Sequence, residues 1–146
     1  MKKTEKLNYQ ITKKYAINLI SECNKQTDTR LILSNRMFGL VLLVGLETGA
    51  RISDLLKMKY SDIVEMKKRP NTYIISFKVK KSNTNHRWVI SVDLKGKINS
   101  TREYMKTVHS YYGDLIFYNA VRKTRFSRRS CCAVNFVRSQ RTVSAQ

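Results

Sequence analysis

The stretch that decides the fold is residues 47–63, which read ETGARISDLLKMKYSDI. Gly49 stands where a helix ends and a residue in the left-handed conformation is needed. The apolar spacing that follows predicts a second, short helix over residues 51–58. The side chain of Arg51 would then project from a helix start beside free backbone N–H groups, which favours the binding of a phosphate.

Two further helices are predicted before this stretch. The nearer one covers residues 36–47, with Ser34 or Asn35 as its N-cap. Its centre, FGLVLLV, is apolar nearly all round, so this helix should be buried on most sides and form the core. The earlier helix covers residues 11–23, where the apolar side chains share one helical face and Thr12 is the expected N-cap.

After the stretch the hydrophobic period changes to two, which indicates strands. Three strands are predicted, over residues 63–66, 73–79 and 86–92. The second and third form a hairpin around the polar turn KKSNTN, residues 80–85. Within the third strand we expect Trp88 to anchor the core and His86 to face solvent.

The rest of the chain is predicted to be mainly helical. Residues 98–109 and 128–138 are expected as helices, with a short buried segment at 115–117 between them. The fold class is therefore mixed α/β (α+β), mainly helical with a small three-stranded antiparallel sheet. A length of 146 residues fits one domain. We expect a loose N-terminus at 1–10 and a frayed tail at 139–146.

The chain is strongly basic. It has 29 Lys and Arg against 10 Asp and Glu, a formal charge of +19 and a pI near 10.2. The last 32 residues carry 7 basic side chains and no acidic one. The leading partner is nucleic acid, bound through salt-sensitive phosphate contacts, and a merely soluble basic surface is the alternative. No membrane partner is expected, because the longest apolar run, MFGLVLLVGL, has ten residues and contains two glycines.

The cysteines point to a reducing compartment. Cys23, Cys131 and Cys132 make an odd set with two adjacent members, which is a poor disulfide framework. No Cys-x-x-Cys is present and both histidines lie far from any paired thiol, so we expect no metal. A cytoplasmic location is expected, since no apolar segment follows the basic N-terminus as in a secretory signal.

Residues 48–63 resemble a motif of the tyrosine recombinases, or phage integrases, whose catalytic domain carries T-G-x-R-x-S-E/D-L-x-x-L-x-W/Y-x-D. Met58 replaces the usual Leu, and Tyr60 the usual Trp. The apolar helix, the hairpin and its lysine also come in the family's order, so the resemblance covers roughly residues 8–138. It implies that fold, and DNA recombination through a 3′-phosphotyrosine link with no metal or nucleotide cofactor.

The resemblance also implies roles for individual residues. Arg51 matches the first catalytic arginine, which holds phosphate oxygens. Lys81 matches the hairpin lysine, a general acid toward the leaving 5′-oxygen; Lys80 is the alternative, because only one of two neighbours points into the site. Asp54 matches an acid that orients Arg51 by a hydrogen bond. The plainer interpretations are a solvated lysine turn and a surface Asp54 paired with Lys57.

Downstream the sequence departs from the family pattern. These 146 residues contain no His-x-x-Arg, and the last tyrosine, Tyr118, precedes the place where that box should begin. Tyr111, Tyr112 and Tyr118 are expected to be core or rim aromatics rather than a displaced nucleophile. We therefore expect residues 11–138 to be the front half of a catalytic domain, truncated before the nucleophile. Such a domain should bind DNA without cleaving it alone.

The expected partners are DNA and other recombinase protomers. Contacts to the DNA backbone are expected from Arg87, Arg122, Lys123, Arg125, Arg128 and Arg129. For the last five of these, the alternative is a solvated face. The rival function is a non-enzymatic basic DNA-binding or regulatory protein. A ribosomal-type RNA binder fits the charge but not the sequence of residues 48–51.

Overall fold

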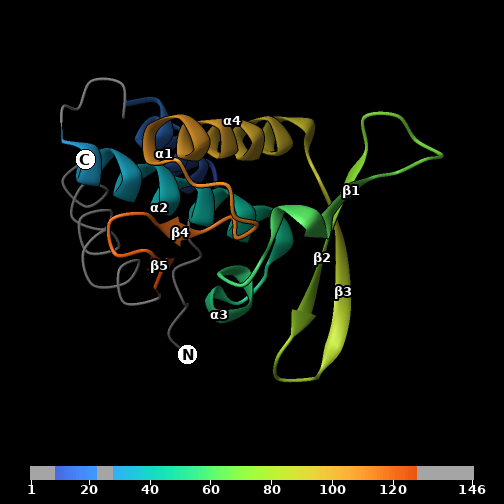
Figure 1. The fold of residues 1–146 in the computed structure, drawn as a ribbon. Helices are drawn as coiled ribbons and strands as arrows, with labels where there is room; N and C mark the ends of the chain where they lie inside the picture. Colours follow the sequence, from blue (N-terminus) through green and yellow to red (C-terminus); the bar gives the residue numbers. More distant parts are fainter. Residues whose placement is uncertain (1–8, 23–27, 128–146) are drawn as a thin grey trace, which may run out of the picture.

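A computed structural model describes residues 9–22 and 28–127, and Figure 1 shows how they are arranged. The long helices lie together, and a three-stranded sheet stands at one end of them. The long helices are α1 (Tyr9–Glu22), α2 (Thr29–Thr48) and α4 (Val92–His109). The shorter elements are α3 (Ile52–Leu55), η2 (Tyr60–Asp62), β1 (Ile63–Glu65), β2 (Tyr73–Val79), β3 (Thr84–Ile90), β4 (Tyr118–Asn119) and β5 (Thr124–Arg125). The predicted α+β class with a three-stranded antiparallel sheet is confirmed.

Helix α2 is the centre of the core. Its buried side chains, among them Met37, Leu40 and Val44, contribute to one apolar cluster with residues of the sheet and of α4. The predicted start at residue 36 was wrong, because Asp28 is the N-cap and its carboxylate accepts the N–H of Arg30 at 3.0 Å. Ser34 and Asn35, the two predicted N-caps, therefore lie inside the helix.

Because α2 is longer than predicted, it also meets the length and composition expected of a membrane span. It has 20 residues and a mean hydropathy of 1.5 over its most apolar window, half of which is buried inside the fold. A core helix of a soluble domain meets the same criteria. The burial of α2 between α1, α4 and the sheet explains its apolar character without a bilayer.

Helix α1 crosses α2 at very short range. A Cβ placed on Gly39 would lie 2.8 Å from the carbonyl oxygen of Ala16 and 2.9 Å from Cγ1 of Ile20. The missing side chain therefore allows the two helix backbones to approach each other. Thr12, predicted as the N-cap of this helix, lies within it, because α1 begins at Tyr9.

The sheet has the order β1-β2-β3 with antiparallel pairing throughout. Its inner face carries Ile75, Phe77 and Ile90, all buried in the core. Trp88 lies opposite Ile75 on that same face but is 44% exposed, so the prediction that it anchors the core was wrong. The physical reason is position: β3 is the edge strand, and at Trp88 the helices no longer cover it.

The segment after α4 packs back against the region of α3. The N–H of Tyr60 donates to the carbonyl of Asp114 at 2.8 Å, and the N–H of Ile116 donates to that of Met58 at 3.2 Å. Ile116 and Phe117 are fully buried, which confirms a buried segment here. Helix α4 itself begins earlier than predicted, because Ser91 caps it by accepting the N–H of Leu94. The predicted helix over 128–138 and the predicted termini lie outside the described residues.

Tyr60 gives the fold a measurable sensitivity to alkaline pH. Its side chain is 7% exposed, its hydroxyl has no partner among the described residues, and burial raises its pKa to about 12. An unfolded tyrosine ionises near pH 10. The ionisation of Tyr60 therefore leaves the free energy of unfolding unchanged below about pH 10. It lowers this free energy by roughly 2–3 kcal/mol as the pH rises from about 10 to 12.

We expect Tyr60→Phe to remove this decrease in the free energy of unfolding at alkaline pH. At pH 8 the variant should be as stable as the parent or more stable by about 1 kcal/mol, since an unpaired hydroxyl is removed from the core. Urea unfolding of both proteins at pH 8 and pH 11 measures the difference, in which the titration of the lysines cancels. A variant that is clearly less stable at pH 8 would contradict the burial of an unpartnered hydroxyl.

Candidate phosphate-binding site

The junction of α2 and α3 is built by local backbone chemistry. Gly49 has φ +66°, the left-handed conformation predicted for it, and its N–H donates to the carbonyl of Gly45 at 2.9 Å. The hydroxyl of Thr48 donates to Val44 at 2.7 Å and accepts the N–H of Ala50 at 3.2 Å. The chain therefore turns sharply, and Arg51 follows as the N-cap of α3.

Helix α3 is shorter than predicted. It covers Ile52–Leu55 and ends in a turn at Leu56, instead of continuing to residue 58. One helical turn has a small dipole and few free N–H groups. The capacity of this junction to hold an anion therefore depends on the guanidinium of Arg51, which is exposed, rather than on the helix start.

The side chains of Arg51 and Lys81 line one cleft of about 550 Å³. Arg51 comes from the α2–α3 junction, and Lys81 comes from the turn between β2 and β3. Figure 1 shows α3 beside the end of this hairpin. The remaining wall includes Asp54, Phe77, His86 and Trp88. The two predicted cations, 30 positions apart in the sequence, thus share one cavity.

The hydrogen bond that the structure gives Asp54 differs from the one predicted. It is 3% exposed, and its Oδ1 accepts the backbone N–H of Lys80 at 3.2 Å, which ties α3 to the β2–β3 turn. Among the described residues no ion pair joins Asp54 to Arg51 or to Lys57. This hydrogen bond connects Asp54 to the turn that carries Lys81. The side chain of Lys81, unlike that of Lys80, lines the cleft.

A second groove of about 450 Å³ adjoins the first and shares Asp54 and Phe77 with it. Four cations line this groove: Lys57, Lys59, Lys78 and Arg87. Of these, only Arg87 was predicted as a contact. The antiparallel register could have found Lys78, because Arg87 pairs with Ser76 and so lies on the same sheet face as Lys78, two residues further along β2.

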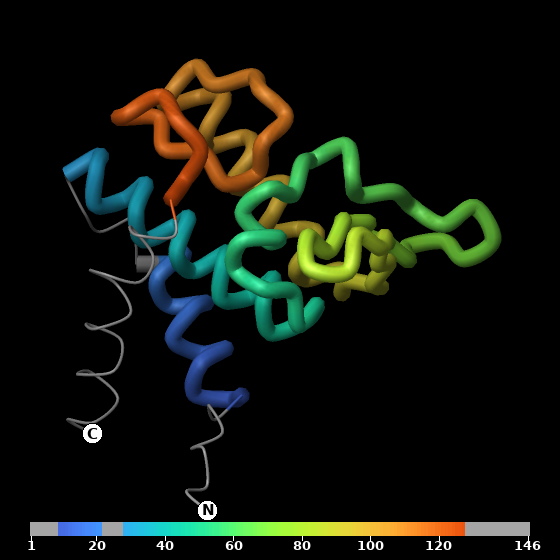
Figure 2. The backbone as a smooth tube through the Cα atoms, turned by 90° about the horizontal axis from the view of Figure 1, so that it is seen from below, coloured from blue at the N-terminus to red at the C-terminus, as the bar shows by residue number. Residues whose placement is uncertain are grey.

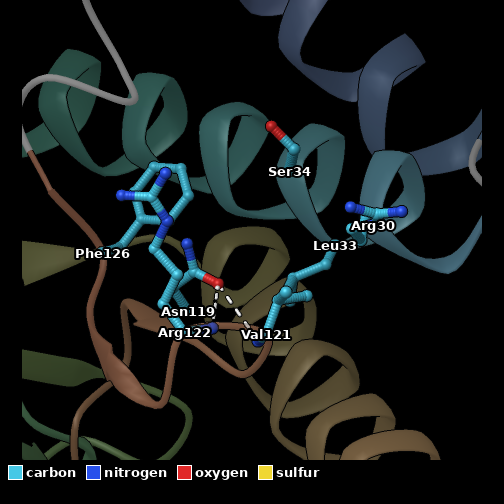
Figure 3. Close-up of a pocket in the computed structure, with 7 residues that line it drawn as sticks. All are labelled: Arg30, Leu33, Ser34, Asn119, Val121, Arg122 and Phe126. Atoms are coloured by element: carbon cyan, nitrogen blue, oxygen red, sulfur yellow. Dashed lines mark hydrogen bonds between the residues drawn. The ribbon is translucent and has the colours of Figure 1, made fainter.

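The C-terminal cations lie elsewhere. Arg122 lines a separate cavity of about 220 Å³ with Arg30 and Phe126, where Asn119 Oδ1 accepts the N–H groups of Val121 and Arg122 (Figure 3). Figures 1 and 2 both show the β4–β5 hairpin, which carries Arg122, Lys123 and Arg125, apart from the sheet. The structure thus does not bring these three into the Arg51 cleft. Arg128 and Arg129 lie outside the described residues.

The late tyrosines do not line the cleft. Tyr111 and Tyr118 stack with ring centroids 4.0 Å apart, and the Tyr111 hydroxyl is bonded to the backbone of Leu115. Burial raises the pKa of Tyr111, which makes its oxygen a poorer nucleophile. Tyr112 is 73% exposed. Tyr111 and Tyr118 are partly buried and pack against the core as predicted, whereas Tyr112 does not. Among the described residues, no cluster of three His, Cys, Asp or Glu could hold a metal ion.

Comparison with known proteins supports the fold. No protein-family model matches the sequence, and a search of curated proteins gives no match. Among solved structures, the chain is similar to the XerH site-specific recombinase bound to its difH substrate in a pre-cleavage complex, with a TM-score of 0.57 and 15% identity. The similarity covers 86% of this chain and 33% of that one, so this chain spans about a third of its length. The predicted tyrosine-recombinase-like fold is confirmed.

Proposed function

We propose that this tyrosine-recombinase-like fold binds DNA and grips a backbone phosphate between Arg51 and Lys81. The observation that carries the proposal is that both cations line one cleft, at the end of a hairpin in a fold shared with a DNA-bound recombinase. The acid that lines the cleft with them, Asp54, accepts the backbone N–H of Lys80 and forms no ion pair with either cation among the described residues. Both cations are therefore available to a phosphodiester.

The two side chains suit different atoms of a phosphodiester. The planar guanidinium of Arg51 can donate to both nonbridging oxygens at once. The ammonium of Lys81 is a compact donor on a flexible stem, suited to a bridging oxygen and to delivering a proton to a leaving 5′-oxygen. Asp54 contributes by fixing the turn that carries Lys81.

The second groove extends the binding surface along the DNA backbone. Its four cations, Lys57, Lys59, Lys78 and Arg87, adjoin the cleft and would contact phosphates next to the one held by Arg51. One carboxylate besides Asp54 lines it, that of Asp62, and this accepts the backbone N–H of Lys59 at 3.0 Å. We propose a backbone role for Arg122, Lys123 and Arg125 as a separate contact on the other side of the fold.

We also propose that these residues bind DNA without cleaving it by themselves. Neither a His-x-x-Arg nor a tyrosine after Tyr118 is present in the 146 residues, and the earlier tyrosines are outside the cleft. A complete catalytic set would need groups from outside these 146 residues, and we propose another recombinase protomer as a protein partner.

Binding and cleavage are tested separately. We expect fluorescently labelled duplex DNA to be bound with a log K that falls with log salt at a slope of about −2 or steeper, because at least two phosphates are neutralised. A library of nicked duplexes should give no covalent protein–DNA adduct on a denaturing gel. Binding that is absent or insensitive to salt would contradict the first claim, and an adduct would contradict the second.

A further inference from the structure

Trp88 is an exposed aromatic side chain in a basic cleft. It is the single tryptophan of the chain, it is 44% exposed, and it lines the cleft of Arg51 and Lys81. Its neighbour across the strand pair, Ile75, is fully buried. The edge position of β3 explains why Trp88 is uncovered. It does not explain why an indole, whose exposure to water costs free energy, lies beside two cations.

The rest of the cleft leaves the indole available. His86, two residues earlier on the same face, stacks on Phe77 with ring centroids 5.9 Å apart and 21° between planes. Among the described residues, the cations that lie over aromatic rings lie over tyrosines, none of them over Trp88. A flat apolar surface and two phosphate-binding cations therefore face the same volume of about 550 Å³, within the range of small-ligand pockets.

We propose that this cleft takes an unpaired nucleotide, with its phosphate on Arg51 and Lys81 and its base stacked on Trp88. This inference rests on the proposed phosphate-binding function and names its substrate more closely. Stacked bases inside a duplex offer no free face, whereas a base at a nick, a branch or a single-stranded segment does. The cleft should thus prefer DNA with an unpaired base to continuous duplex.

The stacking can be measured directly, because all tryptophan fluorescence of this chain comes from Trp88. A short oligothymidylate is titrated into the full chain, in parallel with an abasic oligomer that has the same number of phosphates and no bases. We expect quenching by the first and little by the second. Trp88→Ala should weaken oligothymidylate binding roughly 5- to 150-fold and leave abasic binding unchanged, and Trp88→Phe should keep part of the preference.

Val89→Ala is the matched control. Val89 is the next residue in β3, points to the opposite sheet face and is 60% exposed. Its truncation changes the same strand without changing the cleft, so it should leave both affinities unchanged. Equal affinities for the two oligomers, or an equal loss of both in Trp88→Ala, would overturn the base-stacking inference while leaving phosphate binding intact. Abasic binding that is unchanged by Arg51→Ala would instead overturn the proposed function.

Discussion

Replacing Arg51 with alanine should weaken binding to duplex DNA by roughly 10- to 150-fold. The magnitude follows from a charge-assisted hydrogen-bond pair, worth about 1.5–3 kcal/mol. The slope of log K against log salt should become shallower by about 0.9, because the protein makes one cationic contact fewer to the DNA backbone. Arg51 is exposed, so the free energy of unfolding should change little.

Two comparisons separate the role of Arg51 from its charge. Arg51→Lys keeps the charge but cannot hold two oxygens in one plane, so it should recover part of the lost affinity. Arg122→Ala removes another exposed arginine, which lines the separate cavity near Phe126. If Arg51→Ala and Arg122→Ala weaken binding equally, Arg51 is an ordinary surface charge, and the rival function of a basic regulator is favoured.

The features that could be predicted from the sequence are those encoded locally. The left-handed Gly49 between two helices needed no information beyond its neighbours, and it determined where Arg51 would lie. The alternation in residues 73–79 likewise gave β2 with its observed bounds. The shared cleft of Arg51 and Lys81 was implied by the family resemblance, because no local pattern relates positions 30 apart.

The features that were missed depend on distant parts of the chain. The exposure of Trp88 follows from the edge position of β3. The alternation of apolar and polar residues within β3 does not indicate the order of strands in the sheet. Asp54 has two candidate partners close in sequence, yet it accepts the N–H of Lys80, 26 residues away. The start of α2 was misplaced for another reason: Asp28, Ser34 and Asn35 are all residue types that cap helices, and the cap in the structure is Asp28.

Gly39→Val should destabilise the fold by about 3 kcal/mol, the largest structural effect we expect. The added Cβ would meet Ala16 O at 2.8 Å, Ile20 Cγ1 at 2.9 Å and Leu19 Cβ at 3.3 Å. The nearest of these atoms is backbone, which cannot rotate away, so α1 must shift from α2. The loss should be seen as a lower midpoint in urea unfolding followed by circular dichroism, and it should exceed the gain in helix propensity from replacing glycine.

Glycine-to-alanine substitutions at two helical positions isolate the effect of the contact between α1 and α2. Gly96 lies in α4 with no atom within 4 Å of an added Cβ, so Gly96→Ala should stabilise the protein by about 0.5–1 kcal/mol through helix propensity alone. Gly39→Ala should destabilise it, despite the same gain in propensity. Two changes of equal sign would mean that α1 does not pack on α2 at this distance.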